Sequence, residues 1–315
     1  MKFRKAVLLG IGESALTAEN WKRFDALVEK RVNLAPNDPK LNAELADADC
    51  LFNGFGIEVK KDTIDAAPNL KYIGIFATAF NFVDVAYARS KGITVCNVAG
   101  YSSEAVAEFL FGALLEYMRD LEGSKKLGRE GINEYNGALG TEIKGKVFGV
   151  LGLGNIGGRV AEIAQGFGAD VRYWSRNRKP EIEKRGIKFE NADELIAHAD
   201  ILTPHFSHNN ETIGFINKKR IESMKKGAIL MKFISMESFD IDALVERLGK
   251  GDLVFIFEND EETPKATFTK FAKLKNCAIY PSNAYATSEA MARRQSIFVG
   301  NIDNFLKGKP SNKVS

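Results

Sequence analysis

Short apolar runs alternate with helix-like patterns through residues 1–98. The apolar runs predict strands at 6–9, 50–52, 72–76 and 94–96. The patterns with helical spacing predict helices at 21–31, 40–46, 62–67 and 83–90. Regular alternation of this kind predicts a small parallel sheet covered by helices on both faces.

A long apolar helix is expected next, at residues 105–118, followed by a polar, glycine-rich connection at 123–145. The helix is hydrophobic on all sides, which favours a position between two domains rather than on a surface. The alternation then resumes. Strands are expected at 146–151, 171–174, 187–189, 201–204, 228–233, 253–257 and 277–280, and helices at 159–167, 192–198, 218–224, 241–248 and 288–306. The pattern predicts an α/β protein with two doubly wound parallel-sheet domains.

Three glycines follow the strand at 146–151 at the GxGxxG spacing: Gly152, Gly154 and Gly157, with Asn155 and Ile156 between the last two. In such a turn, the first glycine permits a tight bend, the second lets a pyrophosphate approach the backbone, and the third lets the helix pack on the strand. The helix N-terminus then offers N–H groups and partial positive charge to the phosphates. Strand, glycines, helix and second strand in this order favour a dinucleotide site over a plain glycine-rich turn.

Ser175, Arg176 and Arg178 follow the second strand of this unit, where an NAD site normally carries an acidic residue. A carboxylate would repel a 2′-phosphate, whereas a hydroxyl and two guanidinium groups would bind one. The sequence therefore favours NADP(H) as the cofactor. The alternative is that both arginines are solvated surface charges.

Composition narrows the class of protein. The 315 residues carry a formal net charge of +3, which does not suggest a nucleic-acid partner. No apolar stretch approaches the length of a membrane span. The three cysteines are far apart and the three histidines include no HxxxH pair, so we expect no disulfide framework and no metal site. A reducing, cytoplasmic location fits this composition.

Ligands of doubly wound sheets bind beyond the carboxyl ends of the strands. That rule selects residues 232–235, 258–260 and 280–282, together with the loop 76–82 of the first domain.

The chain resembles the D-isomer-specific 2-hydroxyacid dehydrogenases over nearly its whole length. The resemblance rests on residues 77–109, the GLGNIGG turn, ADILTPHFSHNNET at 199–212, KKGAIL at 225–230, and LKNCAIYPSNAYATSEA at 274–290. The SRNRK stretch resembles the NADP-using glyoxylate and hydroxypyruvate reductases of that family.

The resemblance implies a flavodoxin-like substrate domain, residues 1–98 with 287–315, and a Rossmann NADP-binding domain, residues 99–286. It also implies a homodimer acting on a small molecule in the cleft between the domains. Substrate contacts are expected from Ala77, Thr78 and Ala79, and Thr212 matches a threonine near the cofactor phosphates. His205 matches a histidine whose role in the family is mainly structural.

The chain departs from the family at the catalytic positions. The family uses an arginine, a glutamate and a histidine, and the matching positions here hold Ser235, Asp260 and Ser282. Phe255 stands where the family has an aspartate that meets the nicotinamide amide. A serine supplies neither the fixed charge that holds a carboxylate nor the proton of an imidazolium. The alternative is that Ser235 and Ser282 are polar fillers and Asp260 is a surface acid.

Lys232 ends an apolar run, so we expect it to be partly buried beside the cleft. A buried lysine can titrate low enough for acid–base work, or can hold a substrate anion. The alternative is a lysine that extends its ammonium group to water.

Two functions remain open from the sequence. The first is an NADP(H)-dependent oxidoreductase with a non-standard active site, acting on a 2-oxo acid, a 2-hydroxy acid or a related carbonyl. The second is a catalytically inactive dinucleotide-binding sensor or partner protein. A third possibility is that serines were introduced at positions 235 and 282 of an active parent protein.

Overall fold

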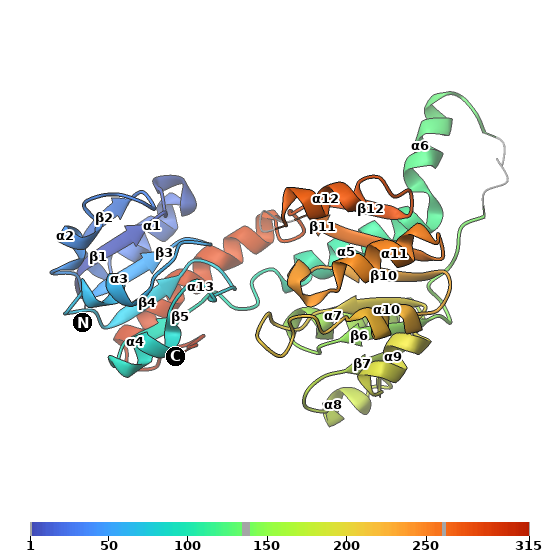
Figure 1. Cartoon of the computed structure of the whole chain (residues 1–315). Coiled ribbons are helices and arrows are strands. Elements are labelled where there is room, and N and C mark those ends of the chain that lie inside the picture. The colour runs from blue at the N-terminus through green and yellow to red at the C-terminus, as the bar shows by residue number, and fades with distance from the viewer. Residues whose placement is uncertain (1, 134–138, 260–262, 315) are drawn as a thin grey trace. The chain divides into compact units, whose positions relative to one another are not determined.

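A computed structural model describes residues 2–133, 139–259 and 263–314 (Figure 1). The chain divides into two compact units. Unit 1 comprises Met1–Ser102 with Thr287–Ser315, and unit 2 comprises Ser103–Ala286.

Unit 1 contains a five-stranded parallel sheet in its described residues, in the order β2-β1-β3-β4-β5, which is the flavodoxin-like order. Its strands are β1 (Phe3–Leu9), β2 (Val28–Leu34), β3 (Cys50–Asn53), β4 (Tyr72–Ile75) and β5 (Thr94–Cys96). Its helices are α1 (Ala18–Asp25), α2 (Leu41–Leu45), α3 (Lys61–Asp65), α4 (Val85–Ser90) and α13 (Ser288–Leu306), and a short 3-10 helix, η1, spans Glu13–Ala15.

Aromatic side chains fill the side of this sheet that faces α1 and α13. The Phe298 ring lies 5.3 Å from that of Phe52 and 6.3 Å from that of Phe24, centre to centre. Phe305 packs on Tyr72 in the same way, at 4.8 Å. The last helix of the chain therefore completes the core of the first unit.

Unit 2 contains a seven-stranded parallel sheet in its described part, in the order β12-β11-β10-β9-β6-β7-β8. Counted from β6, this is the Rossmann order 3-2-1-4-5-6 with one more strand. The strands are β6 (Val147–Leu151), β7 (Asp170–Trp174), β8 (Lys188–Phe189), β9 (Ile201–Pro204), β10 (Ala228–Lys232), β11 (Leu253–Asn259) and β12 (Cys277–Pro281). The helices are α5 (Ser103–Arg119), α6 (Leu121–Arg129), α7 (Asn155–Gly166), α8 (Pro180–Glu183), α9 (Ala192–His198), α10 (Lys218–Ser223), α11 (Ile241–Gly249) and α12 (Lys265–Phe271), with the 3-10 helix η2 at Met236–Ser238.

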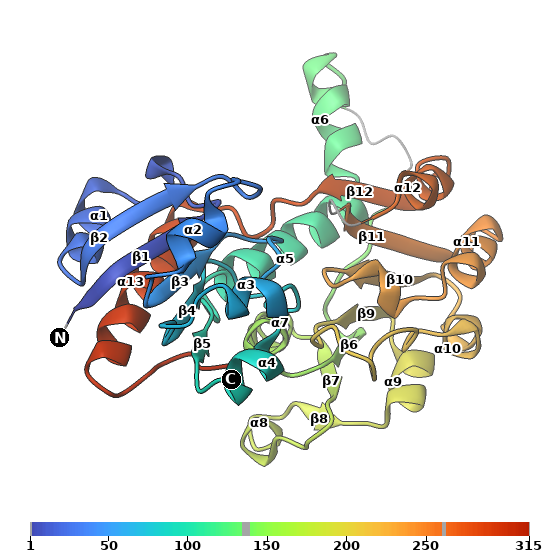
Figure 2. The same ribbon diagram turned by 60° about the vertical axis from the view of Figure 1, so that its left-hand side comes forward.

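Alternate residues of each central strand enter separate hydrophobic cores on the two faces of this sheet. Ile256 of β11 joins the core beneath α5 and α7, whereas Phe255 and Phe257 join the core beneath α9 to α12. Both faces are covered by helices, as the turned view also shows (Figure 2). The predicted fold class, with two parallel-sheet domains, is confirmed.

Two local predictions were wrong. The helix expected at 21–31 ends at Asp25, and the chain continues into the edge strand β2. The helical spacing of Trp21, Phe24 and Val28 extends across this boundary by coincidence, and the exposed charges of β2 are typical of an edge strand. The connection expected at 123–145 begins inside α6, a helix with no buried residue among those described. Gly123 and Gly128 lie within α6, and two glycines in nine residues favour a loop over a helix in the sequence.

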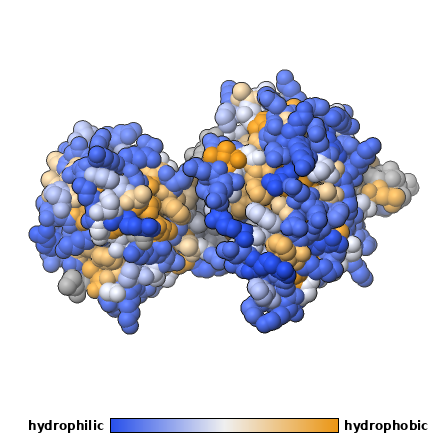
Figure 3. All heavy atoms as spheres, turned by 60° about the horizontal axis from the view of Figure 1, so that its bottom comes forward, coloured by the Kyte–Doolittle hydropathy of each residue, from blue (hydrophilic) through white to orange (hydrophobic). Residues whose placement is uncertain are grey.

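Hydrophilic residues cover most of the visible surface of each unit (Figure 3). In the described part of the chain, no helix has both the length and the apolar character needed to cross a membrane.

Candidate functional site

The glycine-rich turn joins β6 to α7 at the place where the strand order of unit 2 reverses, between β6 and β9. Gly152 adopts φ +95°, a conformation that side chains strongly disfavour. Gly154 is the N-cap residue of α7 and no described side chain caps the helix there. The first N–H groups of α7 thus remain available to a ligand, together with the positive end of the helix dipole.

Each glycine of the motif has the steric environment that its role requires. A β-carbon on Gly152 would lie 2.8 Å from the backbone nitrogen of Phe206, and one on Gly157 would lie 2.0 Å from the carbonyl oxygen of Gly152. A β-carbon on Gly154 would have no described heavy atom within 4 Å, so the backbone there is open to an incoming group. Asn155 is exposed and Ile156 is half-buried at the start of α7.

The three residues predicted to select NADP(H) lie together after β7. The Ser175 hydroxyl donates to the carbonyl oxygen of Asn177 at 2.5 Å, which tightens the turn. Arg176 is 68% exposed and is paired with the equally exposed Glu211. Both side chains are solvated, so the ion pair contributes little to stability and a phosphate can replace Glu211 as the partner of Arg176.

Arg178 is held more firmly than Arg176. Its Nε donates to Glu183 at 3.1 Å and its Nη2 donates to the same carboxylate, while the guanidinium lies 4.9 Å from the centre of the Phe189 ring. Glu183 also accepts the Tyr173 hydroxyl at 2.8 Å, and the two partners hold the pKa of its carboxyl below the usual value. The two arginines that look equivalent in the sequence therefore differ in their freedom to turn toward a ligand.

The loop after β9 packs against the glycine turn. The backbone N–H of His205 donates to the carbonyl oxygen of Leu151 at 2.6 Å, and its Nε2 lies 2.9 Å from the Thr203 hydroxyl. Burial lowers the pKa of His205 to about 3, so the ring is neutral at physiological pH. The Thr212 side chain is buried, and its hydroxyl oxygen accepts a hydrogen bond from the backbone N–H of Asn209, in the same loop, at 2.8 Å.

The residues predicted for catalysis come from the ends of β10, β11 and β12. Lys232 is 1% exposed, and its Nζ donates to the carbonyl oxygen of Glu258 at 2.9 Å. Ser235 is the N-cap residue of η2, and its hydroxyl oxygen accepts the N–H of Glu237 at 3.4 Å. Ser282 is exposed just beyond β12. Asp260 lies outside the described residues.

Glu258 has a role that the sequence did not reveal. Its carboxylate accepts the backbone N–H groups of Asn283 and Ala284, each at 2.7 Å. Through this contact and the Lys232 bond, Glu258 connects the ends of β10, β11 and the loop that carries Ser282. No sequence signal identifies such a residue, since its partners are backbone groups that almost every residue carries.

Phe255, which replaces a family aspartate, is a core residue. Its ring stacks on that of Phe257 at 4.7 Å and lies 5.3 Å from that of Phe271. Met236 belongs to the same core, whereas Phe233 packs toward the opposite face, against Phe109. These apolar side chains therefore belong to cores on opposite faces of the sheet and do not together cover the ends of the strands.

The predicted substrate loop follows β4 in unit 1. Ala77 is buried, whereas Thr78 and Ala79 are exposed. The Thr78 hydroxyl donates to the carbonyl oxygen of Val98 at 2.9 Å, and the side-chain amide of Asn97 donates to the carbonyl oxygen of Thr78 at 2.7 Å. Both bonds fix the backbone of the loop.

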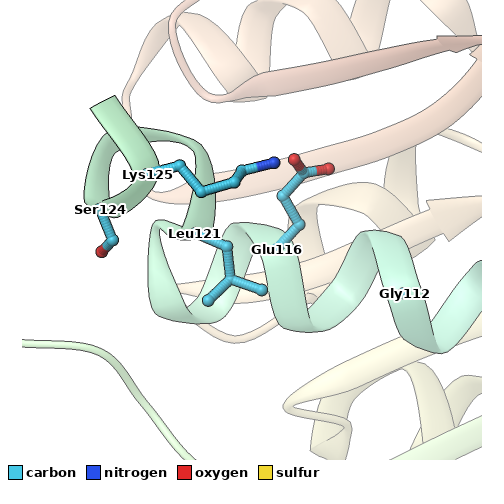
Figure 4. A pocket seen from close by; sticks show the side chains of 5 residues that line it. All are labelled: Gly112, Glu116, Leu121, Ser124 and Lys125. Carbon is cyan, nitrogen blue, oxygen red and sulfur yellow. The ribbon is translucent and has the colours of Figure 1, made fainter. Parts of the chain in front are cut away.

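A pocket between α5 and α6 is lined by other residues than those predicted for the cofactor or for catalysis. Gly112, Glu116, Leu121, Ser124 and Lys125 line it, and the side chains of Lys125 and Glu116 point toward one another (Figure 4). Glu116 also accepts the Tyr280 hydroxyl at 2.6 Å, which with burial raises the tyrosine pKa. Within residues 2–133, 139–259 and 263–314, no three His, Cys, Asp or Glu side chains are placed to hold a metal ion.

Taken together, the seven-stranded sheet, the glycine turn and the open N-terminus of α7 define a dehydrogenase-type NAD(P)-binding domain. Residues 111–284 match the family model described as "D-isomer specific 2-hydroxyacid dehydrogenase, NAD binding domain". The chain belongs to the D-isomer-specific 2-hydroxyacid dehydrogenases, as the sequence motifs predicted.

Relatives match along almost the whole chain. A glyoxylate reductase of Aeropyrum pernix is 33% identical over 307 residues, covering 93% of this chain and 90% of that protein. A hydroxypyruvate reductase of Blautia hydrogenotrophica is 29% identical over 307 residues, covering 94% of this chain and 95% of that protein. This level of similarity supports an oxidoreductase of the family.

Solved structures confirm the fold. An acyclic imino acid reductase, Bsp5, in complex with NADPH and D-Arg superimposes with a TM-score of 0.86 at 23% identity, covering 98% of this chain and 100% of that one. A D-lactate dehydrogenase from Aquifex aeolicus, complexed with NAD and lactic acid, gives a TM-score of 0.84 at 23% identity and covers 96% of each chain. Neighbours of this fold therefore include both NAD and NADPH complexes.

Proposed function

We propose that the protein is an NADP(H)-dependent oxidoreductase that interconverts a 2-oxo acid, or a related carbonyl compound, and its reduced product with a non-standard set of residues. The observation that supports this most directly is the chemistry at the end of β7. A hydroxyl and two guanidinium groups stand beside an intact glycine turn, where an NAD-selective site carries a carboxylate.

The cofactor contacts are assigned to the glycine turn, to α7 and to the residues after β7. The backbone of Gly152, Gly154 and Gly157 with Asn155 and Ile156 holds the pyrophosphate, and Arg176 leads the contact with the 2′-phosphate. Ser175 and Arg178 shape the turn around it. Thr212 supports the loop beside the phosphates from within, since its hydroxyl bonds to its own loop.

When bound, the reduced nicotinamide supplies a hydride to the carbonyl carbon of the substrate. The chain must then hold the substrate and deliver a proton to the carbonyl oxygen. We assign proton delivery to Lys232 and hydrogen bonding of the substrate to Ser235, Asp260 and Ser282. A positioned proton donor contributes about 10²–10⁴-fold to the rate.

Each unit has its own part in this proposal. Unit 2 binds the cofactor, and the loop with Ala77, Thr78 and Ala79 in unit 1 binds the substrate. The test is a fluorescence titration with NADPH and NADH, followed by turnover assays with glyoxylate, hydroxypyruvate and a panel of other carbonyls and imines. The imines belong in the panel because the neighbour Bsp5 is named an acyclic imino acid reductase. Tighter binding of NADH than of NADPH would contradict the cofactor assignment.

The second candidate is a dinucleotide-binding protein without catalysis. It is favoured by Ser235, whose side chain caps η2, and by Ser282, because neither residue carries the charge of the family residue at its place. It predicts NADPH binding with no turnover across the whole substrate panel.

Two further features belong to the proposal. We expect a homodimer, which the exposed apolar side chains of Tyr117, Leu121 and Ile132 in and beside α5 and α6 support; light scattering on the purified protein tests it. We expect a reducing, cytoplasmic location, since Cys50, Cys96 and Cys277 are all free thiols.

A further inference from the structure

Arg294, on the second turn of α13, is an arginine without a polar partner in the part of unit 1 that the structure describes. Its Nε is buried and has no hydrogen-bond acceptor, and no described carboxylate pairs with its guanidinium. An arginine carries five N–H donors, and leaving a buried donor unsatisfied is unfavourable by about 1–3 kcal/mol. A bound ligand with a hydrogen-bond acceptor would satisfy this donor.

The two neighbours of Arg294 along the helix show the contrast. Arg293 donates from Nε to the carbonyl oxygen of Tyr101 at 2.9 Å. Gln295 accepts the backbone N–H of Thr17 at 2.8 Å and the side-chain amide of Asn20 at 3.0 Å. Both therefore anchor α13 to the rest of unit 1, whereas Arg294 contributes no such bond.

Aromatic rings hold the guanidinium of Arg294 in place. Its central carbon lies 4.4 Å from the centre of the Phe76 ring and 5.8 Å from that of Tyr101. Phe76 directly precedes the loop with Ala77, Thr78 and Ala79, so the cation packs on the residue from which that loop begins. Because rings replace water around the guanidinium, its attraction for an anion is stronger than at an exposed site.

The loop itself offers a second set of donors. The hydroxyl of Thr78 and the amide of Asn97 fix its conformation, and the backbone N–H groups of Thr78 and Ala79 reach no acceptor among the described residues. Free backbone N–H groups two and three residues after Phe76, whose ring holds the guanidinium, suit a carboxylate, which accepts hydrogen bonds at both oxygens.

We propose that Arg294 binds the carboxylate of the substrate, together with the backbone N–H groups of the loop 78–79, and so makes the protein selective for 2-oxo or 2-imino acids over neutral carbonyl compounds. This inference rests on the proposed function. It supplies the fixed positive charge that Ser235 cannot provide at the position where the family has an arginine.

The test measures binding of oxamate, a non-reacting analogue of a 2-oxo acid, by calorimetry with and without saturating NADPH. Arg294→Gln should weaken oxamate binding about 10- to 100-fold, the range expected for losing a charged hydrogen-bond partner. Arg294→Lys keeps the charge and loses the fork, so its effect should be intermediate. Arg89→Gln, an exposed arginine of α4, is the matched control and should leave oxamate binding unchanged.

Turnover gives a second readout. In Arg294→Gln the KM for glyoxylate should rise about as much as the oxamate Kd, while the KM for a neutral aldehyde and the Kd for NADPH stay constant. Equal oxamate binding by wild type and Arg294→Gln overturns the inference, and so does a wild type that binds NADPH but no oxamate. A wild type that binds oxamate through Arg294 but has no preference for NADPH overturns the cofactor assignment instead and leaves this inference standing.

Discussion

The carbonyl oxygen of Gly152 lies 2.0 Å from the point that a β-carbon on Gly157 would occupy. Backbone on both sides forms this contact, so no side chain can move to relieve a clash. The closeness of these two residues fixes how α7 leaves the end of β6.

Gly157→Ala is therefore expected to destabilise unit 2 by about 3 kcal/mol, the upper end of the range for overpacking, and to weaken NADPH binding as α7 shifts. Urea unfolding and a fluorescence titration measure the two effects. Gly158→Ala is the control, since a β-carbon there would have no described atom within 4 Å. A helical alanine should stabilise by up to about 1 kcal/mol, and equal behaviour of the two variants would show that the contact is unimportant.

Arg176→Ala should raise the KM for NADPH about tenfold or more and leave the KM for NADH unchanged, because only NADPH carries the 2′-phosphate. Arg178→Ala should have a smaller effect on cofactor preference, since this arginine is engaged with Glu183 and Phe189. Steady-state kinetics with both cofactors measures the ratio. An equal loss for NADH and NADPH in Arg176→Ala would argue against phosphate recognition.

Glu211→Gln provides the complementary change. The Glu211 carboxylate competes with a phosphate for Arg176, so its neutralisation should tighten NADPH binding by a few fold, most clearly at low salt. Weaker NADPH binding in this variant would mean that Glu211 orients the arginine rather than competing for it.

Lys232→Met should lower kcat by about 10²–10⁴-fold if the ammonium group delivers the proton. In the wild type, Lys232 Nζ donates to the carbonyl oxygen of Glu258 at 2.9 Å. The variant loses this hydrogen bond and should therefore be less stable by about 1–3 kcal/mol. Lys232→Arg keeps the charge and serves as the control for stability. An unchanged kcat in Lys232→Met would remove Lys232 from the mechanism.

His205 should make the protein acid-sensitive below neutral pH. Burial lowers its pKa from 6.5 to about 3, so the folded state keeps the ring neutral while the unfolded state takes up a proton. Above pH 6.5 the ring is neutral in both states and has no effect, and as the pH falls from 6.5 toward 3 the folded state loses about 1.4 kcal/mol of stability per pH unit. His205→Gln should therefore lose less stability than wild type between pH 7.5 and pH 5 in urea unfolding.

Ser235→Arg combined with Ser282→His should raise glyoxylate reduction if the scaffold keeps the family geometry. The arginine restores a charge that holds the carboxylate, and the histidine restores a proton donor worth about 10²–10⁴-fold. The NADPH-dependent rate with glyoxylate measures the gain. No gain in a folded double variant would show that the ends of β10 and β12 have diverged from that geometry.

The strands of both sheets and the glycine turn were predictable because buried strands and tight turns need particular residues in a particular order. The edge strand β2 was not predictable, because most of its residues are charged or polar and partly exposed, so they do not form the apolar run of a buried strand. At the candidate site, sequence order placed Lys232, Ser235 and Ser282 at strand ends. It could not reveal the bonds of Glu258 to backbone N–H groups, or the difference between Arg176 and Arg178, because both depend on which partner lies nearby in space.

Helix α13 packs on aromatic residues that stand more than two hundred positions earlier in the chain. During synthesis on the ribosome, Phe24, Phe52 and Tyr72 emerge first, but Phe298 and Phe305 emerge only after all of unit 2. Unit 2 can therefore complete its own core while the sheet of unit 1 still lacks the helix that covers it. A nascent chain arrested before α13 should therefore carry a protease-resistant unit 2 and an exposed, chaperone-binding sheet from unit 1.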